Sequence, residues 1–193
     1  MITPLNKGHS KEISKIHSVA LSGDFLPSFG LPFLKAFYEG IIGKPGVYGF
    51  GLVKSGKIRG FVVGTKDSNK FFSSALQSNF IKLSFLLILQ LIKKPRLLKN
   101  VLETFLYPKK DTGPKAELIV IAVDRNYQRK GLGKKLVRAL EGAFKSDGIR
   151  RYKLTVHADK KAVGFYKHLK YSRVSNFNLY GKMWFVYAKK ISS

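Results

Sequence analysis

The order of apolar and polar residues predicts a buried strand, a glycine-rich turn and an amphipathic helix in the middle of the chain. Residues 118–123 form an unbroken apolar run that is partly β-branched, which indicates a buried strand. Gln128, Gly131 and Gly133 follow in a Q-x-x-G-x-G turn. The helix after this turn has an apolar face made of Leu132, Leu136, Val137, Leu140 and Phe144. The sequence therefore predicts that a helix begins a few residues after a strand ends.

Apolar residues recur with the periods of strands and helices on both sides of this strand, turn and helix. On the N-terminal side they predict a strand over residues 1–5, a helix with Ser10 as its N-cap, a helix opened by Pro32, and strands over 47–53 and 58–65 joined by a turn at Gly56. On the C-terminal side they predict a strand over 149–156, a helix over 159–169, and a final hairpin of strands 172–179 and 183–190.

Residues 66–115 form an apolar insert between the first hairpin and the central strand. Residues 80–92 are apolar nearly all round, but this run is shorter than the about 20 apolar residues that cross a bilayer. A second apolar stripe begins after Pro95, so we expect two helices that pack as a hairpin. The insert is either an extra piece of core, or a surface that lies against an anionic membrane or covers a lipophilic or glycan acceptor. The second interpretation rests on the flanking cations Lys82, Lys93, Lys94, Arg96 and Lys99.

The glycine turn before the central helix is suited to binding an anion. A helix start exposes about four unpaired N–H groups and carries roughly half a positive charge, and glycines let an anion approach the backbone. We expect this anion to be a pyrophosphate. The dinucleotide-binding loop is excluded because its third glycine is replaced by Leu136. The Walker loop is excluded because Gln128 and Lys135 stand where it needs Gly and Ser or Thr.

The strand, turn and helix together resemble the acetyl-CoA motif R/Q-x-x-G-x-G/A of the GNAT N-acetyltransferase superfamily. Residues 159–171 (DKKAVGFYKHLKY) resemble the second signature of that family, N-x-x-A-x-x-F-Y-x-x-x-G-F. Asp159 stands where that signature has Asn, and Lys170 where it has Gly. The resemblance is loose over residues 1–65 and close over 116–190, and it implies acetyl-CoA as the acetyl donor. The implied cofactor-binding residues are Ile121, Ala122, Val123, Gln128, Arg129, Lys130, Gly131, Leu132, Gly133, Lys134 and Asp159.

Two residues are predicted to be catalytic. Glu117 lies at the spacing from Gln128 at which the histone-acetylating branch of the family carries its general base, and a carboxylate can take a proton from an amine directly or through water. Tyr166 matches the family's F-Y position and is the candidate acid for the departing thiolate. The alternatives are a solvent-exposed carboxylate on an edge strand and a buried tyrosine with its hydroxyl satisfied elsewhere.

The resemblance also implies that the loop between the first two helices borders the acceptor site. Phe25, Phe29 and Tyr38 are therefore candidates for contact with the acceptor, although aromatic residues at helical spacing are more often part of a core. His17 fits a packed histidine better than a catalyst. Protein amines, amino sugars, polyamines and drug-like amines all remain as acceptors.

Composition narrows the class of protein further. The 193 residues contain no cysteine, which excludes disulfides and a thiol nucleophile, and the four histidines show no metal-ligand spacing, so we expect no metal. The net charge of +25 predicts attraction to nucleic acid, anionic lipid or phosphorylated cofactors without choosing among them. No signal peptide is recognisable, so we expect a cytoplasmic protein that can lie at the inner face of the membrane.

These observations predict one domain over residues 1–193, of the α/β (α+β) class. We expect a mixed, mostly antiparallel twisted sheet flanked by helices, as in the GNAT fold that the motifs resemble, with a helical hairpin inserted at residues 66–115. The expected function is acetyl transfer from acetyl-CoA directly to a primary amine. The alternative is a non-catalytic basic module of the same fold that binds an anionic membrane or nucleic acid.

Overall fold

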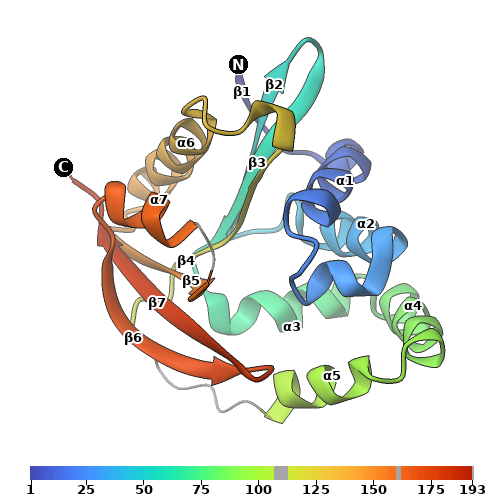
Figure 1. Cartoon of the computed structure of the whole chain (residues 1–193). Helices are drawn as coiled ribbons and strands as arrows, with labels where there is room; N and C mark the ends of the chain where they lie inside the picture. The colour runs from blue at the N-terminus through green and yellow to red at the C-terminus, as the bar shows by residue number, and fades with distance from the viewer. Residues whose placement is uncertain (107–112, 160–161, 193) are drawn as a thin grey trace.

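A mixed sheet runs through the computed structural model, which describes residues 1–106, 113–159 and 162–192 (Figure 1). Within these residues seven strands follow the order β1-β2-β3-β4-β5-β7-β6. Every neighbouring pair is antiparallel except β4 and β5. The strands are β1 (Ile2–Pro4), β2 (Val47–Lys54), β3 (Lys57–Thr65), β4 (Glu117–Val123), β5 (Arg151–His157), β6 (Ser172–Leu179) and β7 (Lys182–Lys190). The predicted sheet is confirmed.

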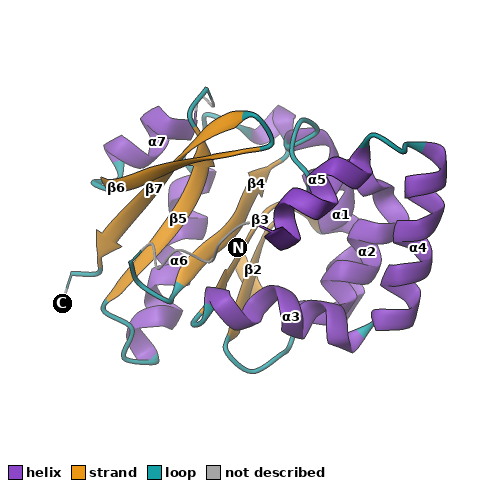
Figure 2. Ribbon diagram, turned by 90° about the horizontal axis from the view of Figure 1, so that it is seen from below, coloured by secondary structure: helices purple, strands orange, loops and turns teal. Residues whose placement is uncertain are grey.

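Helices cover the sheet on both faces. In Figures 1 and 2, α6 and α7 lie on one side of the sheet, and the helices of the N-terminal region and of the insert lie on the other. The helices are α1 (Ser10–Ala20), α2 (Gly30–Ile41), α3 (Ser68–Ser78), α4 (Phe80–Lys93), α5 (Leu97–Leu106), α6 (Leu132–Ser146) and α7 (Ala162–His168). Short 3-10 turns occur at η1 (Lys7–His9), η2 (Leu26–Phe29) and η3 (Arg125–Tyr127). Residues 107–112 of the insert and 160–161 of the predicted helix over 159–169 lie outside the described residues.

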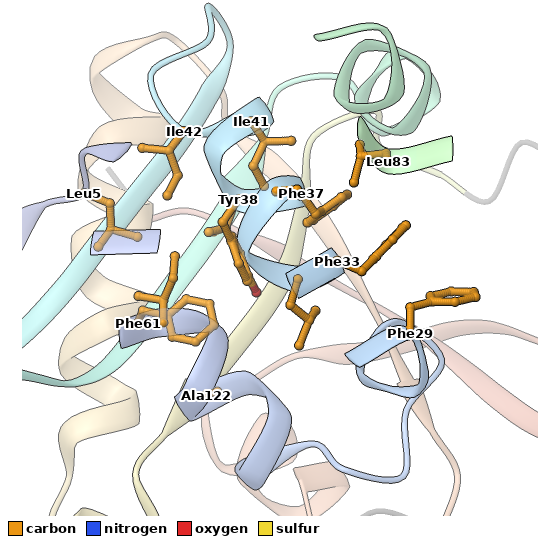
Figure 3. Close-up of a cluster of buried hydrophobic side chains, with 14 of the residues drawn as sticks. Leu5, Phe29, Phe33, Phe37, Tyr38, Ile41, Ile42, Phe61, Leu83 and Ala122 are labelled. Carbon is orange, nitrogen blue, oxygen red and sulfur yellow. The ribbon is translucent and has the colours of Figure 1, made fainter. Parts of the chain in front are cut away.

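The core has two parts, one on each face of the sheet. Figure 3 shows the first part, where α2 packs on the sheet with Tyr38 next to Phe61. The second lies between the sheet and the apolar face of α6, on which Leu136, Val137, Leu140 and Phe144 are buried as predicted. At Gly64 on β3 an added Cβ would lie 2.7 Å from Leu140 Cδ1, so α6 and β3 are too close for a side chain there.

The start of α1 differs from the prediction by one residue. Ser10 is the first residue of the helix, and the N-cap position is occupied by His9 because η1 leads directly into α1. Farther along this helix, His17 is buried, and its Nδ1 lies 2.6 Å from the Tyr38 hydroxyl. Burial lowers the pKa of His17 to about 4, against a smaller opposing effect of Asp24. The expectation of a packed histidine agrees with this environment.

The insert contains three helices in the described residues, where the sequence predicted a hairpin of two. The unpredicted helix, α3, begins after Asp67, whose carboxylate accepts hydrogen bonds from the N–H groups of Asn69 and Lys70. Leu83 of α4 and Val101 of α5 are buried in the same core cluster as α2, and α5 also reaches the β6–β7 hairpin (Figure 1). In the described part of the chain, no helix is both long enough and apolar enough to cross a membrane.

The exit from α7 provides a test of backbone strain. Lys170 follows the helix with a φ of 62°, in the left-handed region that glycine adopts freely. Its side chain is exposed, so we expect Lys170→Gly to raise the free energy of unfolding by about 0.5–1 kcal/mol. Denaturant unfolding measures this difference. Lys170→Ala removes the same side chain without relieving the strain and should give no gain; equal stability of the two variants would contradict the prediction.

Candidate active site

The two parallel strands at the centre of the sheet separate shortly after they meet. In the described chain β4 and β5 pair only at Glu117–Lys153 and Leu118–Leu154. The register of β3 against β4 shifts so that Val63 pairs with Val120 and Gly64 with Leu118, which leaves one extra residue on β4. Such a bulge bends a strand. The rest of β4 and β5 diverges into a gap whose two edges carry unpaired backbone groups.

The glycine turn leads from this gap into α6. Gly131 occupies the N-cap position with a φ of 72°, and an added Cβ there would meet nothing within 4 Å. The first bond inside the helix runs from Lys135 N to Gly131 O, so the N–H groups of the residues between them lack an intrahelical acceptor. At Gly133, an added Cβ would lie 3.1 Å from Phe165 Cζ. The two glycines therefore differ: Gly131 sets the backbone conformation, and Gly133 lets α7 pack against α6.

The loop before the turn is held in place and is cationic. Asp124 accepts a hydrogen bond from Asn126 N, and its carboxylate lies 3.4 Å from the Arg59 guanidinium. Gln128 donates a hydrogen bond from its side chain to the carbonyl oxygen of Val123 at 3.0 Å, which ties the loop to the end of β4. Lys54, Arg59 and Lys130 place their charges over the Tyr127 ring. The predicted residues Arg129, Lys130 and Lys134 are exposed beside the helix start.

The gap and the helix start together suit a ligand that is extended and carries an anion at one end. The unpaired edge of β4, where Ile121, Ala122 and Val123 lie, can exchange hydrogen bonds with amides as a neighbouring strand would. The first turn of α6 and its exposed cations can hold the anion. The remaining predicted ligand, Asp159, is exposed at the far end of β5.

Glu117 lies where β4 and β5 are still paired. Its Oε1 accepts a hydrogen bond from Thr155 Oγ1 at 3.2 Å, and Ser68 and Lys153 also interact with the carboxylate. Burial raises the pKa of Glu117 above its ordinary value, and these three partners oppose that shift only in part. The alternative of a solvent-exposed carboxylate on an edge strand is wrong, because β4 lies between β3 and β5. A carboxylate with a raised pKa is a better base near neutral pH.

Tyr166 is buried in α7 against the rings of Phe165 and Tyr171. Burial raises the pKa of its hydroxyl well above the ordinary value, and Asp24 raises it further. Asp24 belongs to the loop between α1 and α2, on the other face of the sheet from α7 (Figure 1). The electrostatic effect of Asp24 therefore reaches Tyr166 from the opposite face. Glu117 and Tyr166 have separate sets of interacting partners.

The structure adds His157 to the site, a residue that sequence reasoning did not select. Its side chain is 8% exposed, and its Nε2 has no hydrogen-bond partner among the described residues. It lies two residues beyond Thr155 on β5, on the same face of that strand, and its ring packs edge-on against Trp184. A buried polar atom without a partner costs about 1–3 kcal/mol, so a ligand atom is a natural partner for it. The polar alternation of Lys153, Thr155 and His157 was the signal in the sequence.

The three aromatic candidates for acceptor contact have different environments. Phe25 is half-buried and stacks on Tyr180 at the tip of the β6–β7 hairpin, with 5.0 Å between ring centroids. Phe29 and Tyr38 are buried in the core (Figure 3). The Tyr38 hydroxyl is already bonded to His17, so its environment is that of a packing residue, and contact of Phe29 or Tyr38 with an acceptor stays a prediction.

Comparison with known proteins agrees with this geometry. The model of the acetyltransferase (GNAT) family matches residues 19–171. No curated protein matches the sequence. The fold is similar to that of the ribosomal-protein-S18-alanine N-acetyltransferase from Escherichia coli, at 18% identity and a TM-score of 0.64, over 100% of this chain and 94% of that one. It is also similar to the PaiA N-acetyltransferase from Thermoplasma acidophilum in complex with coenzyme A, at 16% identity and a TM-score of 0.60, over 98% of each chain.

The helix start can be tested as an anion site by substituting Gly131. A valine there is strained at a φ of 72°, so the turn and the N–H groups behind it should move, and we expect affinity for coenzyme A to fall by roughly tenfold or more. Calorimetric titration measures the affinity. Gly142→Val is the matched control, because Gly142 lies in the same helix with equally open space around it. Unchanged affinity in a folded Gly131→Val variant would argue against the site.

Proposed function

This chain belongs to the GNAT family of acetyltransferases, and on that premise we propose that it transfers an acetyl group from acetyl-CoA directly to a primary amine. The observation that carries the proposal is the gap between β4 and β5, which opens next to the free N–H groups of the α6 start. Acetyl-CoA contains amides in its pantetheine arm and bears a pyrophosphate, so its hydrogen-bonding groups match the open strand edges and its anion matches the helix start. Its thioester supplies the activated acetyl group.

We assign acetyl-CoA binding to two groups of residues. The edge of β4 would bond the pantetheine amides, and the turn with its cations would hold the pyrophosphate. The charge of Lys134 and the N–H groups of the first turn act on the same anion, so their contributions reinforce one another. The assigned residues are Ile121, Ala122, Val123, Gln128, Arg129, Lys130, Gly131, Leu132, Gly133 and Lys134. Asp159, which follows the C-terminal end of β5, is assigned with them.

Glu117 and Tyr166 would move the protons that direct transfer requires. An amine must lose a proton as its nitrogen bonds to the acetyl carbon, and the sulfur must gain one as the carbon–sulfur bond breaks. The raised pKa of Glu117 suits it to accept the first proton. The raised pKa of Tyr166 keeps its hydroxyl protonated near neutral pH, so it is present as a hydrogen-bond donor for the sulfur. No covalent intermediate with the protein is needed.

The acceptor would enter on the face that carries Glu117, Thr155 and His157. Phe25 and Tyr180 border this side, and the Asp24 carboxylate gives it negative charge against the strongly basic remainder of the protein. A positively charged amine is favoured there. A protein amine, an amino sugar, a polyamine and a drug-like amine all meet this requirement.

The rival function is a basic module that keeps the fold without turnover. Release of free coenzyme A thiol from acetyl-CoA, measured against a panel of these amines, distinguishes the two. Amine-dependent thiol release supports the enzyme. A folded protein that binds coenzyme A but releases no thiol with any amine class would favour the rival module.

Removing the Tyr166 hydroxyl should affect the chemical step alone. Tyr166→Phe keeps the ring packing, so we expect unchanged affinity for coenzyme A and a turnover lower by about 10²–10⁴. Steady-state kinetics and calorimetry measure the two quantities. Tyr171→Phe is a neighbouring control: it breaks a buried hydrogen bond to Tyr152, so it should lower stability while turnover stays close to wild type. A wild-type turnover for Tyr166→Phe would end the acid role.

Glu117→Gln should change the pH dependence of the reaction. With the raised pKa, wild-type kcat/KM should fall on the acid side as Glu117 takes up its proton. The variant lacks the base and depends on free amine, so its deficit should be largest below the acceptor pKa, about 10.4 for a lysine-like amine, and shrink as pH approaches it. Glu39→Gln makes the same charge change on α2 and should leave the profile unaltered. Superimposable profiles for Glu117→Gln and wild type would remove Glu117 as the base.

A further inference from the structure

The outer face of α4 is apolar although it faces solvent. Ile81, Phe85, Ile88 and Ile92 are 85%, 60%, 55% and 73% exposed. Their spacing of four, three and four residues places them in one row along the helix, and we call this row the α4 stripe. Solvent-facing rows on surface helices are normally polar. A contiguous apolar row of this kind indicates a contact surface.

The inner face of the same helix is already satisfied. Leu83 is fully buried, and Leu86, Leu87 and Leu91 pack against the core on the side of α2 (Figure 3). The core therefore uses the inner apolar residues of α4 and leaves the α4 stripe uncovered. A helix that is apolar all round is usually buried on all sides, so the α4 stripe has a role that core packing does not explain.

Cations outnumber acidic groups around the α4 stripe. Lys93, Lys94 and Arg96 are exposed directly after its last residue, at the end of α4 and in the turn to α5. Lys82 and Lys99 flank it, with ion pairs to Glu39 and Glu103. Glu103 is the sole acidic residue of the sequence from 80 to 106, and it also accepts a hydrogen bond from Tyr180 N. The surroundings of the stripe are therefore positive.

The charge pattern decides between possible partners. In a symmetric dimer each α4 stripe would meet its copy, which would bring the cations around one stripe up to a second chain of charge +25. Like charges then oppose that contact. An anionic bilayer matches both features at once, because apolar side chains enter the boundary of the acyl chains while lysine and arginine stay among acidic headgroups. We propose that the α4 stripe docks this protein on the surface of an anionic phospholipid membrane.

Docking through the α4 stripe would fix the orientation of the molecule. Figure 1 shows α4 and α5 at one end and the start of α6 near the other. The acetyl-CoA loop would therefore face away from the lipid. The tip of the β6–β7 hairpin, which bonds to α5 and borders the acceptor side, would lie toward it. The docking surface is independent of the acetyl-transfer proposal, since it requires no turnover.

Flotation with lipid vesicles tests the proposal. We expect the full chain to float with vesicles of phosphatidylcholine and phosphatidylglycerol, to float less with phosphatidylcholine alone, and to be released as salt screens the lysines and arginine. Ile88→Asp places a charge in the centre of the α4 stripe and should abolish flotation. Val19→Asp is the matched control: Val19 is also a helix residue, 52% exposed, on α1. It should float as wild type.

A second pair of variants tests the cations. Lys93→Gln with Lys94→Gln should weaken flotation with the anionic vesicles. Lys11→Gln with Lys15→Gln removes two exposed charges from α1 and should not. Circular dichroism checks that every variant is folded, and a melting curve shows whether Ile88→Asp retains the wild-type stability expected of an exposed position.

Three outcomes would overturn the proposal. The first is a wild-type protein that stays unbound with anionic vesicles at low salt. The second is equal loss of flotation for the two lysine pairs with none for Ile88→Asp, since binding would then reflect net charge alone. The third is a dimer by light scattering that Ile88→Asp dissociates, which would assign the α4 stripe to a second copy. None of these outcomes alters the thiol-release test of acetyl transfer.

Discussion

Two neighbouring strands that pair at only two positions leave backbone N–H and C=O groups facing an open gap in the middle of a sheet. Each such group costs free energy unless it finds a partner. The gap persists because each strand is held on its other side, β4 by β3 through Gly60–Val123 and β5 by β7 as far as His157–Trp184. The bulge on β4 then directs the two strands apart. An extended ligand that pairs with these edges would compensate the open backbone.

An electrostatic interaction connects residues on opposite faces of the sheet. In a closed sheet, groups on opposite faces are separated by a layer of backbone. Here the Asp24 carboxylate, on the loop after α1, affects Tyr166 of α7 on the other face. The face that carries Glu117 supplies a half-buried carboxylate and the Nε2 of His157, which has no partner among the described residues. In the proposed reaction, the amine would therefore meet Glu117 from one face and the thioester sulfur would meet Tyr166 from the other.

The parts of the fold that depend on local sequence were predictable. The β4 run, the turn at Gly131 and the apolar face of α6 are contiguous, so a pattern of apolar residues and glycines was enough to predict the helix start. Helix α3 was missed because its polar, serine-rich sequence has no clear apolar period, and its start depends on the Asp67 cap and on Phe71 packing against Phe37 of α2. The apolar stripes of α4 and α5 predicted that both helices pack, but not that both join the core cluster of α2.

The site residues also divide into those that local sequence predicts and those that depend on contacts between distant parts of the chain. Glu117 and Tyr166 were selected from spacing and motif, whereas the effect of Asp24 and the environment of His157 arise from the arrangement of strands and loops far apart in the sequence. Lys170 shows a further limit of motif comparison. The residue type at that position departs from the motif, whereas its backbone keeps a conformation typical of glycine. A substitution in a motif can therefore leave the geometry unchanged and add only strain.

The insert is connected both to the centre of the sheet and to the C-terminal hairpin. Its first helix provides Ser68 as a partner of the Glu117 carboxylate, and its last helix fixes the β6–β7 hairpin through Glu103 and Tyr180 N. Phe25 then stacks on the same hairpin from the loop after α1. The helix with the exposed apolar row lies between these two attachments in the chain. Because α3 is tied to β4 through Ser68 and α5 to the β6–β7 hairpin through Glu103, α4 is connected at both ends to elements fixed on the sheet, so its exposed apolar row keeps a defined orientation relative to the sheet.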